Sequence, residues 1–493
     1  MSHANTVALT WDTGVFALPV LTIAAGIVLV MILAGWRRSN VTSYIASQVI
    51  LLLAILLSLV YFPTTTINFT TLAKLDKVSA TLFIITCFTA LAILKVAREQ
   101  LKGHVEAHEE YYILFLLVIL GASTLIMANH FATLFLGFEL MSIALVGLIG
   151  YLKQQDSSVE ASFKYLILSA AASSFMLLGI ALLYAYSGTL YFDGSPLTAA
   201  TLLKANAHEL PPLVLSLGCL LFFSGLAFKI SLVPFHFWTP DVYAGAPTSV
   251  TLLLATISKL AIFTGVLKCS FSPLFHGYFL QPEVYSVFGG LAILSIIVGN
   301  VLALQQRQLK RILAFSSIAH MGYLMILVFV ASNNSVSLAW QSMIFYFVAY
   351  LLASVAVFYL LNIVEINNGG KQVVIDDFKG MFWRAPYDAL LIVISLLSLA
   401  GIPLTAGFIG KFYLVTFASF HALWLLLGAI VVGSTISLAY YLPVVFALFG
   451  DRGATMPLAR VRVSSSILVI TMILASLYLG VLPGQFSEFL TWL

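Results

Sequence analysis

The sequence predicts an all-α polytopic membrane protein with about 14 transmembrane helices. Hydrophobic residues make up 61% of the 493 residues and charged residues only 9%. Soluble domains carry roughly 45–50% apolar and about 25% charged residues. The apolar residues form continuous runs, whereas the strands of a membrane barrel would alternate apolar and polar residues. We therefore expect most of the chain to lie inside a lipid bilayer.

About fourteen apolar runs follow one another, each near the length that crosses a hydrocarbon core. They are predicted at 15–36, 43–62, 78–96, 111–128, 130–152, 163–187, 211–236, 247–269, 284–304, 312–331, 336–363, 388–420, 421–448 and 464–484. The seventh run carries Pro234 near its end, and the long twelfth contains Gly401, Pro403 and Gly407. Membrane helices tolerate such breaks where the freed backbone groups face protein or a wet cavity. Both helices are therefore expected to be discontinuous.

The positive charges of the loops divide unevenly between the two sides of this array. If the N-terminus lies outside, sixteen of the 23 lysines and arginines fall in inside loops. The four in outside loops are Lys74, Lys77, Lys204 and Lys268. Lysine and arginine are enriched on the inner side of membranes, so both termini are predicted outside.

The loops carry no signature of a soluble activity. The longest, 188–210 and 365–387, are shorter than the roughly 50 residues that a folded domain needs. Basic residues do not gather in any run, which argues against a nucleic-acid partner. Cys87, Cys219 and Cys269 lie in or beside apolar segments without metal-binding spacing. We expect inert buried thiols and no metal site.

Three lysines and one glutamate stand inside the apolar runs, namely Glu139, Lys229, Lys259 and Lys411. A charged side chain at the bilayer centre costs roughly 2.5–3.5 kcal/mol on insertion scales, so such residues face the protein interior or serve a function. Burial disfavours the charged form of an ionisable group. A buried group can then bind and release a proton near neutral pH. A Glu–Lys pair that forms and breaks would act as a proton switch.

These residues also have structural interpretations. Glu139 is able to hold two helices together, and Lys229 lies close enough to its helix end to snorkel to the inside surface. Lys259 lies in mid-helix, too deep to do so easily. Lys411 follows the break of its helix. A functional role is favoured over the structural one at all four residues.

Four further polar residues lie in or beside the predicted helices. His320 is a single histidine on an apolar helix, where packing is the commoner role, although its polar neighbours favour function. Lys164 opens the sixth helix near the inside surface, where a lysine typically anchors the topology. His236 and Asp241 flank the inside end of the seventh helix. A helix-end role and a proton-relay role are both open for this last pair.

Two five-helix units are predicted within the array. An odd number of helices gives successive units opposite orientations, as in inverted-repeat transporters. In both, the fourth helix has a proline and a buried lysine, Lys229 before Pro234 and Lys411 after Pro403. The second helices carry the glutamate and the histidine at comparable depth. The predicted parts are three N-terminal helices, the two units and a C-terminal helix, at 1–110, 111–270, 271–450 and 451–493.

The chain resembles the antiporter-like membrane subunits of respiratory complex I over essentially all its predicted helices. The resemblance rests on the segments GFELMSIALVGLIGY, FKYLILSA, FKISLVPFHFWTPDVYAGAPTSVTLLLATISKLAIF, RILAFSSIAHMGY and GIPLTAGFIGKF. The stretch from Lys229 to Lys259 is the most specific. Among these subunits the chain is most similar to the N type of bacterial NADH:quinone oxidoreductase. The M type resembles the pattern but carries a glutamate at the position of Lys411.

Six positions match polar residues of this family's proton path, namely Glu139, Lys164, Lys229, Lys259, His320 and Lys411. Glu139 matches the fifth-helix glutamate, and Lys229 and Lys411 match the lysines of the two broken helices. Lys259 matches the central lysine of the eighth helix. His320 and Lys164 match polar positions of the hydrated path. The resemblance thus implies that these residues carry protons.

The resemblance further implies a subunit without its own cofactor. NADH, FMN, Fe–S clusters and quinone are expected in partner subunits, whose redox chemistry drives proton translocation. It also implies a bacterial inner membrane, periplasmic termini and other membrane subunits as partners. One alternative is a subunit of a multisubunit sodium/proton antiporter, which shares the fold and is distinguished by sodium dependence and copurifying proteins. The other is a structural scaffold, for which the four deep charges would be dispensable.

Overall fold

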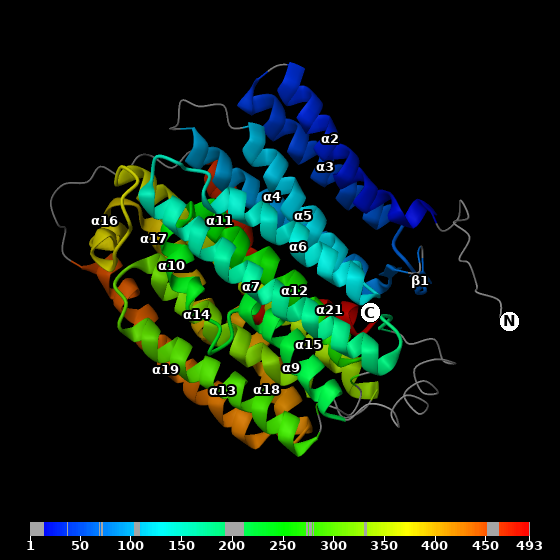
Figure 1. Cartoon of the computed structure of the whole chain (residues 1–493). Helices are drawn as coiled ribbons and strands as arrows, with labels where there is room; N and C mark the ends of the chain where they lie inside the picture. The colour runs from blue at the N-terminus through cyan, green and yellow to red at the C-terminus, as the bar shows by residue number, and fades with distance from the viewer. Residues whose placement is uncertain are drawn as a thin grey trace.

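The structure is a computed structural model that describes residues 14–36, 38–68, 70, 72–102, 109–192, 212–272, 275, 279, 281–329, 333–450 and 463–492. Nearly all of these residues are helical, and the helices pack side by side in one bundle (Figure 1). This confirms the predicted all-α membrane fold. By length and composition the described part has 12 helices able to cross a membrane, or 13 if one bent pair counts as a span. The count of fourteen stays a prediction.

The N-terminal part supplies three long helices and a small hairpin. Its elements are η1 (Val15–Ala17), α2 (Leu18–Trp36), α3 (Asn40–Val60), β1 (Ile67–Asn68), β2 (Lys74–Leu75) and α4 (Lys77–Leu101). The strands pair antiparallel, with Ile67 opposite Leu75. Asp76 caps α4, since its Oδ1 accepts a hydrogen bond from the backbone N–H of Ser79 over 2.7 Å. Such a cap satisfies one of the free N–H groups at a helix start.

The next stretch corresponds to the first predicted five-helix unit. Its elements are α5 (Glu109–Met127), α6 (Phe131–Ile149), α7 (Asp156–Ser187), α9 (Pro212–Ile230), α10 (Trp238–Gly245), α11 (Thr248–Leu253), the π-helix η2 (Leu254–Ser258) and α12 (Lys259–Ser270). The predicted eighth helix is therefore one apolar span with a π-helical segment in its middle. Such segments are rare and often occur at functional sites.

The remaining elements include the second predicted unit and the C-terminal helices. They are α13 (Pro282–Leu304), α14 (Leu309–Leu324), η4 (Met325–Val328), α15 (Asn333–Asn367), η5 (Ile375–Phe378), α16 (Met381–Arg384), α17 (Pro386–Ala400), α18 (Ala406–Phe420), α19 (Trp424–Phe449), α20 (Val463–Val481) and α21 (Gly484–Trp492). The last two helices form the bent pair, at 84° to each other. The Lys77 ammonium fastens α21 by donating to the carbonyl of Trp492 over 2.9 Å.

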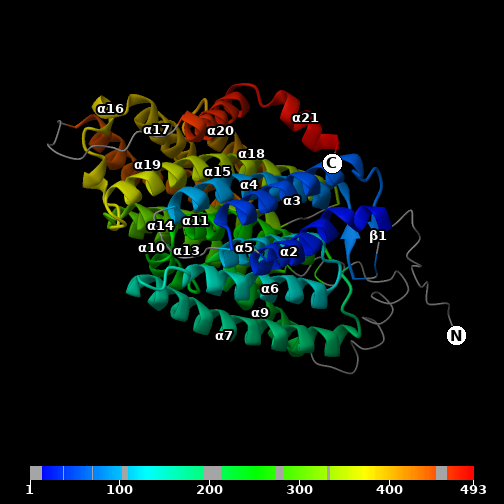
Figure 2. The same ribbon diagram turned by 90° about the horizontal axis from the view of Figure 1, so that it is seen from above.

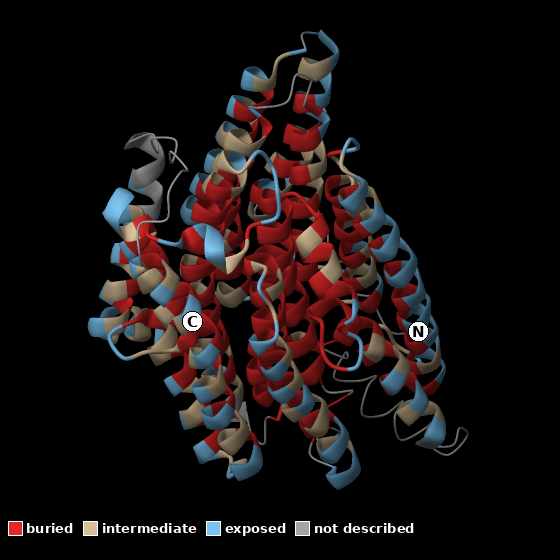
Figure 3. Ribbon diagram, turned by 90° about the vertical axis from the view of Figure 1, so that its left-hand side faces the viewer, coloured by how far each residue is buried: buried red, intermediate tan, exposed pale blue. Residues whose placement is uncertain are grey.

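The centre of the bundle is formed by spans that carry polar residues. In the most apolar 18-residue stretch of each span, 100% of residues are buried in Thr248–Ser270 and 94% in Leu309–Val328, against 28% in Val15–Trp36. Figure 3 shows this gradient from a buried centre to exposed outer helices. Seen from above, α6, α7 and α9 lie along one side and α17, α18 and α20 along the other (Figure 2). Polar side chains on the central spans are thereby kept from lipid.

The predicted break of the seventh helix occurs earlier than its proline. Helix α9 ends at Ile230, and Ser231 has a positive φ of 66°. Side chains satisfy the backbone groups that the break leaves free. The Trp238 indole donates to the carbonyl of Phe228 over 2.8 Å, and the N–H of Val233 donates to Ser295 Oγ over 2.9 Å. This is how a membrane helix tolerates interruption.

The twelfth predicted helix divides into α17 and α18, as expected from its glycines and proline. Gly401 ends α17 with a φ of 83°, a conformation that favours glycine. The N–H of Gly407, in the first turn of α18, donates to Ser398 Oγ over 3.2 Å. The carbonyl of Ala400 accepts from the Lys411 ammonium over 2.6 Å. The second break thus also has side-chain partners for its backbone.

Parts of the sidedness prediction fall outside the described residues. This applies to Arg37, Lys204, Arg452, Arg460 and Arg462, and to most of the loop predicted at 188–210. The placement of both termini outside therefore stays a prediction, as do the boundaries and inverted relation of the two units. The three cysteines are buried and form no disulfide within the described residues, and their burial was expected.

Candidate functional site

Three lysines lie in the interior of the bundle. Lys229, Lys259 and Lys411 have exposed fractions of 2%, 0% and 6%. No carboxylate within the described residues lies in ion-pair distance of these three ammonium groups; hydroxyl and carbonyl oxygens hold them instead. An uncompensated buried charge is costly. Packing alone does not explain buried lysines at these positions. Their placement therefore favours a role in binding and releasing protons.

Lys229 is held by one face of α7. Its Nζ donates to Tyr165 OH over 2.7 Å and to Ser169 Oγ over 2.8 Å, and it lies 4.4 Å from the centre of the Tyr165 ring. Glu139 of α6 accepts a hydrogen bond from Ser173 Oγ. Ser173 lies one turn from Ser169 and donates to its carbonyl as well. The predicted Glu139–Lys229 pair is therefore open, and two serines of α7 lie between its members.

Lys259 begins α12 directly after the π-helix η2. Its Nζ donates to Ser317 Oγ of α14 over 2.5 Å and lies 5.9 Å from the centre of the Tyr243 ring. The phenols of Tyr243 and Tyr350 also lie close to Ser317. A π-helical turn shifts the register of the residues that follow it. This turn places the Lys259 side chain against α14.

His320 follows Ser317 by three residues on α14, so the two side chains share one face of the helix. Its Nδ1 lies 2.5 Å from Tyr346 OH of α15. The imidazole ring also packs against Tyr350, with ring centres 5.0 Å apart. The sequence leaves His320 open between packing and function. The structure places it next to the Lys259 contact, in a tyrosine-lined pocket.

A small cavity connects His320 with Lys411. Its volume is about 10 Å³, close to the smallest that holds one water molecule. Its lining residues are His320, Tyr346, Ala349, Tyr350, Ser398, Leu399, Gly407 and Lys411. The side chains thus form a row from Lys259 through Ser317, His320 and Tyr346 to Lys411.

Lys164 lies apart from this row, at the end of the bundle that is predicted to face the inside. It pairs with Glu160 over 2.7 Å and with Asp241 over 3.1 Å, and its side chain is 43% exposed. Arg311 also reaches Asp241, over 3.1 Å. His236 is buried, and its Nδ1 has no hydrogen-bond partner within the part of the chain that the structure describes. The geometry of Lys164 suits the anchoring interpretation as well as a surface proton relay.

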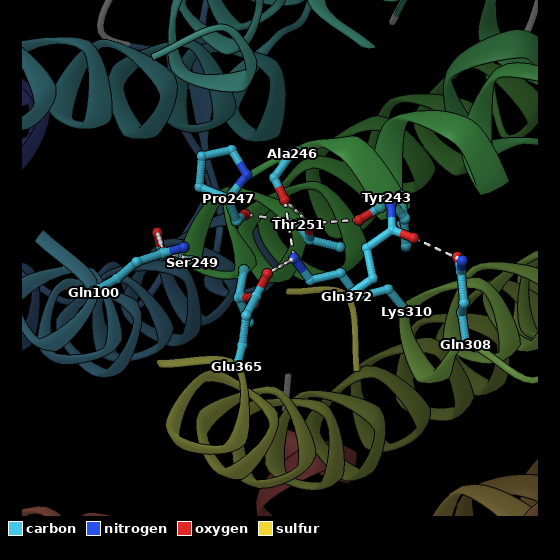
Figure 4. A network of polar contacts seen from close by, with 11 residues as sticks. Gln100, Tyr243, Ala246, Pro247, Ser249, Thr251, Gln308, Lys310, Glu365 and Gln372 are labelled. Atoms are coloured by element: carbon cyan, nitrogen blue, oxygen red, sulfur yellow. Dashed lines mark hydrogen bonds and ion pairs between the residues drawn. The ribbon is translucent and has the colours of Figure 1, made fainter. Parts of the chain in front are cut away.

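One largely buried ion pair was missed from the sequence. Lys310 Nζ lies 2.9 Å from Glu365 Oε1, between the start of α14 and the end of α15 (Figure 4). Both residues border apolar runs, where a charge is expected to meet water. Lys310 also donates to the carbonyl of Ala246 over 3.1 Å, and Thr248 Oγ1 donates to Glu365. The only sequence signal was that each charge stands within a turn or so of an apolar run.

The profile of one family, described as NADH:quinone oxidoreductase/Mrp antiporter, TM, matches residues 128–437. That is more than half of the chain and includes all six candidate residues together with the whole row from Lys259 to Lys411. The chain belongs to this family. The similarity that the sequence suggests is therefore confirmed: this is an antiporter-like membrane subunit of the complex I type.

Solved structures support the same family assignment. The chain is 28% identical to a chain of respiratory complex I from Thermus thermophilus with bound aureothin, with a TM-score of 0.81, covering 96% of this chain and 99% of that one. Its fold also matches a chain of an archaeal membrane-bound sulfane sulfur reductase (TM-score 0.82, 23% identity, covering 97% of this chain and 96% of that one). A chain of the Mrp complex from Dietzia sp. DQ12-45-1b matches as well (TM-score 0.83, 18% identity, covering 97% and 96%). All three similar chains belong to membrane complexes.

Proposed function

We propose that this chain is a proton-translocating subunit, of the N type, in the membrane arm of a respiratory NADH:quinone oxidoreductase. The observation that carries the proposal is the row of polar side chains from Lys259 to Lys411 through the buried centre of the bundle. Near-full-length similarity to a chain of complex I at 28% identity supports the choice of complex. In this proposal the chain holds no redox centre, and cofactors and quinone bind in partner subunits.

The proposed path uses the contacts of this row in order. A proton from the inside reaches the Lys259 amine, and Ser317 lies against its Nζ at 2.5 Å. His320, one helical turn further, passes it through Tyr346 or a water in the cavity to Lys411. Lys411 releases it outside. Each transfer forms one O–H or N–H bond as another breaks, so no co-reactant is needed.

The Glu139–Lys229 pair acts in this proposal as the switch. The pair is open here, with Ser169 and Ser173 between its members. If Lys229 moves to Glu139, a positive charge moves away from the region of Lys259. A like charge close by disfavours protonation of an amine, so closing the pair loads Lys259 and opening it drives the proton onward. Redox chemistry in partner subunits would set the state of the pair.

The proposal includes a location and partners. We place the chain in a bacterial inner membrane with both termini on the periplasmic side, as the lysine and arginine bias of the loops indicates. Its partners are other membrane subunits of the complex. The similar chains of known structure all belong to membrane complexes, which supports this part.

A sodium/proton antiporter subunit is the second candidate function, favoured by the antiporter in the family's description and by the fold of the Mrp complex chain. The proteins that copurify with this chain distinguish the two. Sodium-dependent transport together with antiporter partners would favour the second candidate. A structural scaffold without an ion path remains the third, and it predicts normal pumping after loss of the buried lysines.

The decisive experiment replaces the buried lysines in the assembled complex. Lys259→Met and Lys229→Met keep side-chain volume but remove the ammonium, and Lys153→Met is the control because Lys153 is exposed in a turn. Quinone reduction and proton pumping are measured in vesicles with equal amounts of assembled complex. We expect both buried variants to lose most pumping and the control to retain it. Normal pumping in Lys259→Met would refute the proposal.

A further inference from the structure

The Lys310–Glu365 pair joins three elements at one end of the bundle (Figure 4). Lys310 lies in the first turn of α14 and Glu365 near the end of α15, with their charged atoms 2.9 Å apart. Lys310 also binds the carbonyl of Ala246 in the turn before α11, and Thr248 at the start of α11 binds Glu365. These elements lead to the central polar row: α14 carries Ser317, α15 carries the tyrosines beside His320, and α11 continues into Lys259.

The Lys310–Glu365 pair lies at the end of the central span that is predicted to face the inside. Under the predicted topology, the start of α11 and α14 and the end of α15 lie at the inner side of the membrane. The side chain of Glu365 is 15% exposed and that of Lys310 is 7% exposed. Glu365 therefore reaches water on one side and the sealed span Thr248–Ser270 on the other. Among the charged residues at this end, Asp241 is bound to the partly exposed cations Lys164 and Arg311, whereas Glu365 contacts the span itself.

The first turns of that span are rich in hydroxyl groups. Thr248 binds Glu365, Ser249 Oγ donates to Gln100 Oε1 over 2.7 Å, and Thr251 Oγ1 lies 3.1 Å from the carbonyl of Tyr243. Lys259 follows Thr248 by 11 residues, about 16 Å along a helix with a rise of 1.5 Å per residue. Tyr243 lies beside the Lys259 ammonium. Between Glu365 and Lys259, polar groups thus lie near Glu365, in the first turns of the span, and again beside the Lys259 ammonium.

We propose that Glu365 is the carboxylate that takes up protons on the inside face and supplies them to Lys259, with Lys310 as its positioning residue. The inference rests on the proposed proton-translocating function. Uptake breaks an O–H bond of hydronium and forms one on Glu365; delivery breaks that bond, and an N–H bond forms on Lys259 through intervening water. Lys310 keeps the carbonyl of Ala246 as a partner when Glu365 is neutral, so protonation does not leave its charge without one.

The alternative role of the pair is a structural clasp between three elements. Glu365→Gln distinguishes the structural role from proton uptake, because the amide oxygen still accepts a hydrogen bond but the side chain no longer takes up a proton. Glu365→Asp keeps the carboxylate and tests rescue. Glu99→Gln is the matched control, since Glu99 also pairs with a lysine of the inside end, Lys102 at 2.5 Å. Lys259→Met is measured beside them.

The assay is redox-driven proton pumping by the assembled complex in vesicles. We expect Glu365→Gln to lower the initial pumping rate about tenfold or more, in the range of a lost acid–base group. Glu365→Asp should recover at least half of the rate, and Glu99→Gln should match the wild type. A clasp would instead give normal pumping in Glu365→Gln, or equal losses in the glutamine and aspartate variants, and either result overturns the inference.

Two comparisons keep the test decisive. If Glu365→Gln lowers assembly, the double variant Lys310→Gln/Glu365→Gln replaces it, because no charge is then left unpaired; wild-type pumping by that variant overturns the inference. Lys259→Met separates the two proposals. Normal pumping in Lys259→Met refutes the proposed function itself. A loss in Lys259→Met with normal pumping in Glu365→Gln refutes only the role of Glu365.

Discussion

The ammonium of Lys259 donates a hydrogen bond to the hydroxyl of Ser317 over 2.5 Å, from the start of α12 to the middle of α14. Both residues are fully buried. This contact joins the central lysine of the chain to the helix that carries His320. The two predicted units are therefore in direct hydrogen-bond contact, because the lysine belongs to the first unit and the serine to the second.

Removing this hydroxyl should slow the transfer step. In Ser317→Ala the buried ammonium loses its hydrogen-bond partner, at a cost of about 1–3 kcal/mol, and each 1.4 kcal/mol is about tenfold in rate or equilibrium. We expect pumping to fall about tenfold while the complex still assembles. Ser174→Ala is the control, since Ser174 is exposed and bonds only its own helix. Equal rates in both variants would show that Ser317 is dispensable.

The hydroxyl of Tyr346 should matter more than its ring. It lies 2.5 Å from His320 Nδ1 and lines the small cavity next to Lys411. Tyr346→Phe keeps the packing but removes the group that can relay a proton, so we expect a loss of about tenfold in pumping. Tyr413→Phe, on the neighbouring helix α18, is the matched control. A relay that bypasses Tyr346 would leave both variants at the wild-type rate.

Gly401 should tolerate no side chain. A Cβ at this position would lie 2.7 Å from Lys411 Cδ, and the φ of 83° disfavours other residues, by roughly 1–2 kcal/mol. Gly401→Ala should therefore displace the Lys411 side chain and lower pumping, with a small loss of stability. Gly428→Ala is the control, because a Cβ there meets no atom within 4 Å. Pumping rates and the apparent melting temperature of the two variants decide the matter.

Asp76 should stabilise the start of α4 in a pH-dependent way. Burial raises the pKa of its carboxyl, but the charge of Lys268 and the hydrogen bonds from Ser79 outweigh it and hold the pKa below its ordinary value. A lowered pKa in the folded state contributes stability above the unfolded-state value of about 3.9. That contribution is lost as the pH falls through the folded-state value.

The test compares Asp76→Asn with the wild type. Asparagine still caps a helix, so this variant removes the charge rather than the cap. We expect Asp76→Asn to lower the apparent melting temperature at pH 7 and the difference to shrink toward pH 3. A constant difference across this range would mean that the charge does not contribute. Asp76→Ala also removes the helix cap, so its free energy of unfolding should fall by a further amount of about 0.5–2 kcal/mol.

Several candidate functional residues could be predicted from the sequence because they are charged residues within apolar segments. A lysine at 229, 259 or 411 and a glutamate at 139 are anomalies in apolar runs, and their cost in a bilayer makes them informative. The break of the twelfth helix was visible in the same way, from Gly401 and Pro403. The break of the seventh was placed at Pro234, whereas α9 ends at Ile230. A proline marks an interruption but does not set which backbone bonds find side-chain partners.

Other residues of the site carry no such anomaly. Ser317 and Tyr346 are ordinary in membrane helices, and only the packing of α14 against α12 and α15 turns them toward Lys259 and His320. Lys310 and Glu365 stand at the ends of apolar runs, where charges normally meet water. Their pairing needs the ends of α14 and α15 to be close, and the two residues are 55 positions apart in the chain.

The sequence alone determined that this protein lives in a membrane, which helices are broken and which deep charges are unusual, because each of these depends on local composition and the cost of charge in lipid. The tertiary structure decided how those charges are connected. It left the Glu139–Lys229 pair open, joined Lys259 to Ser317 and placed a water-sized cavity beside Lys411. Such contacts depend on helix rotation and on the π-helical turn before Lys259, which no local pattern encodes.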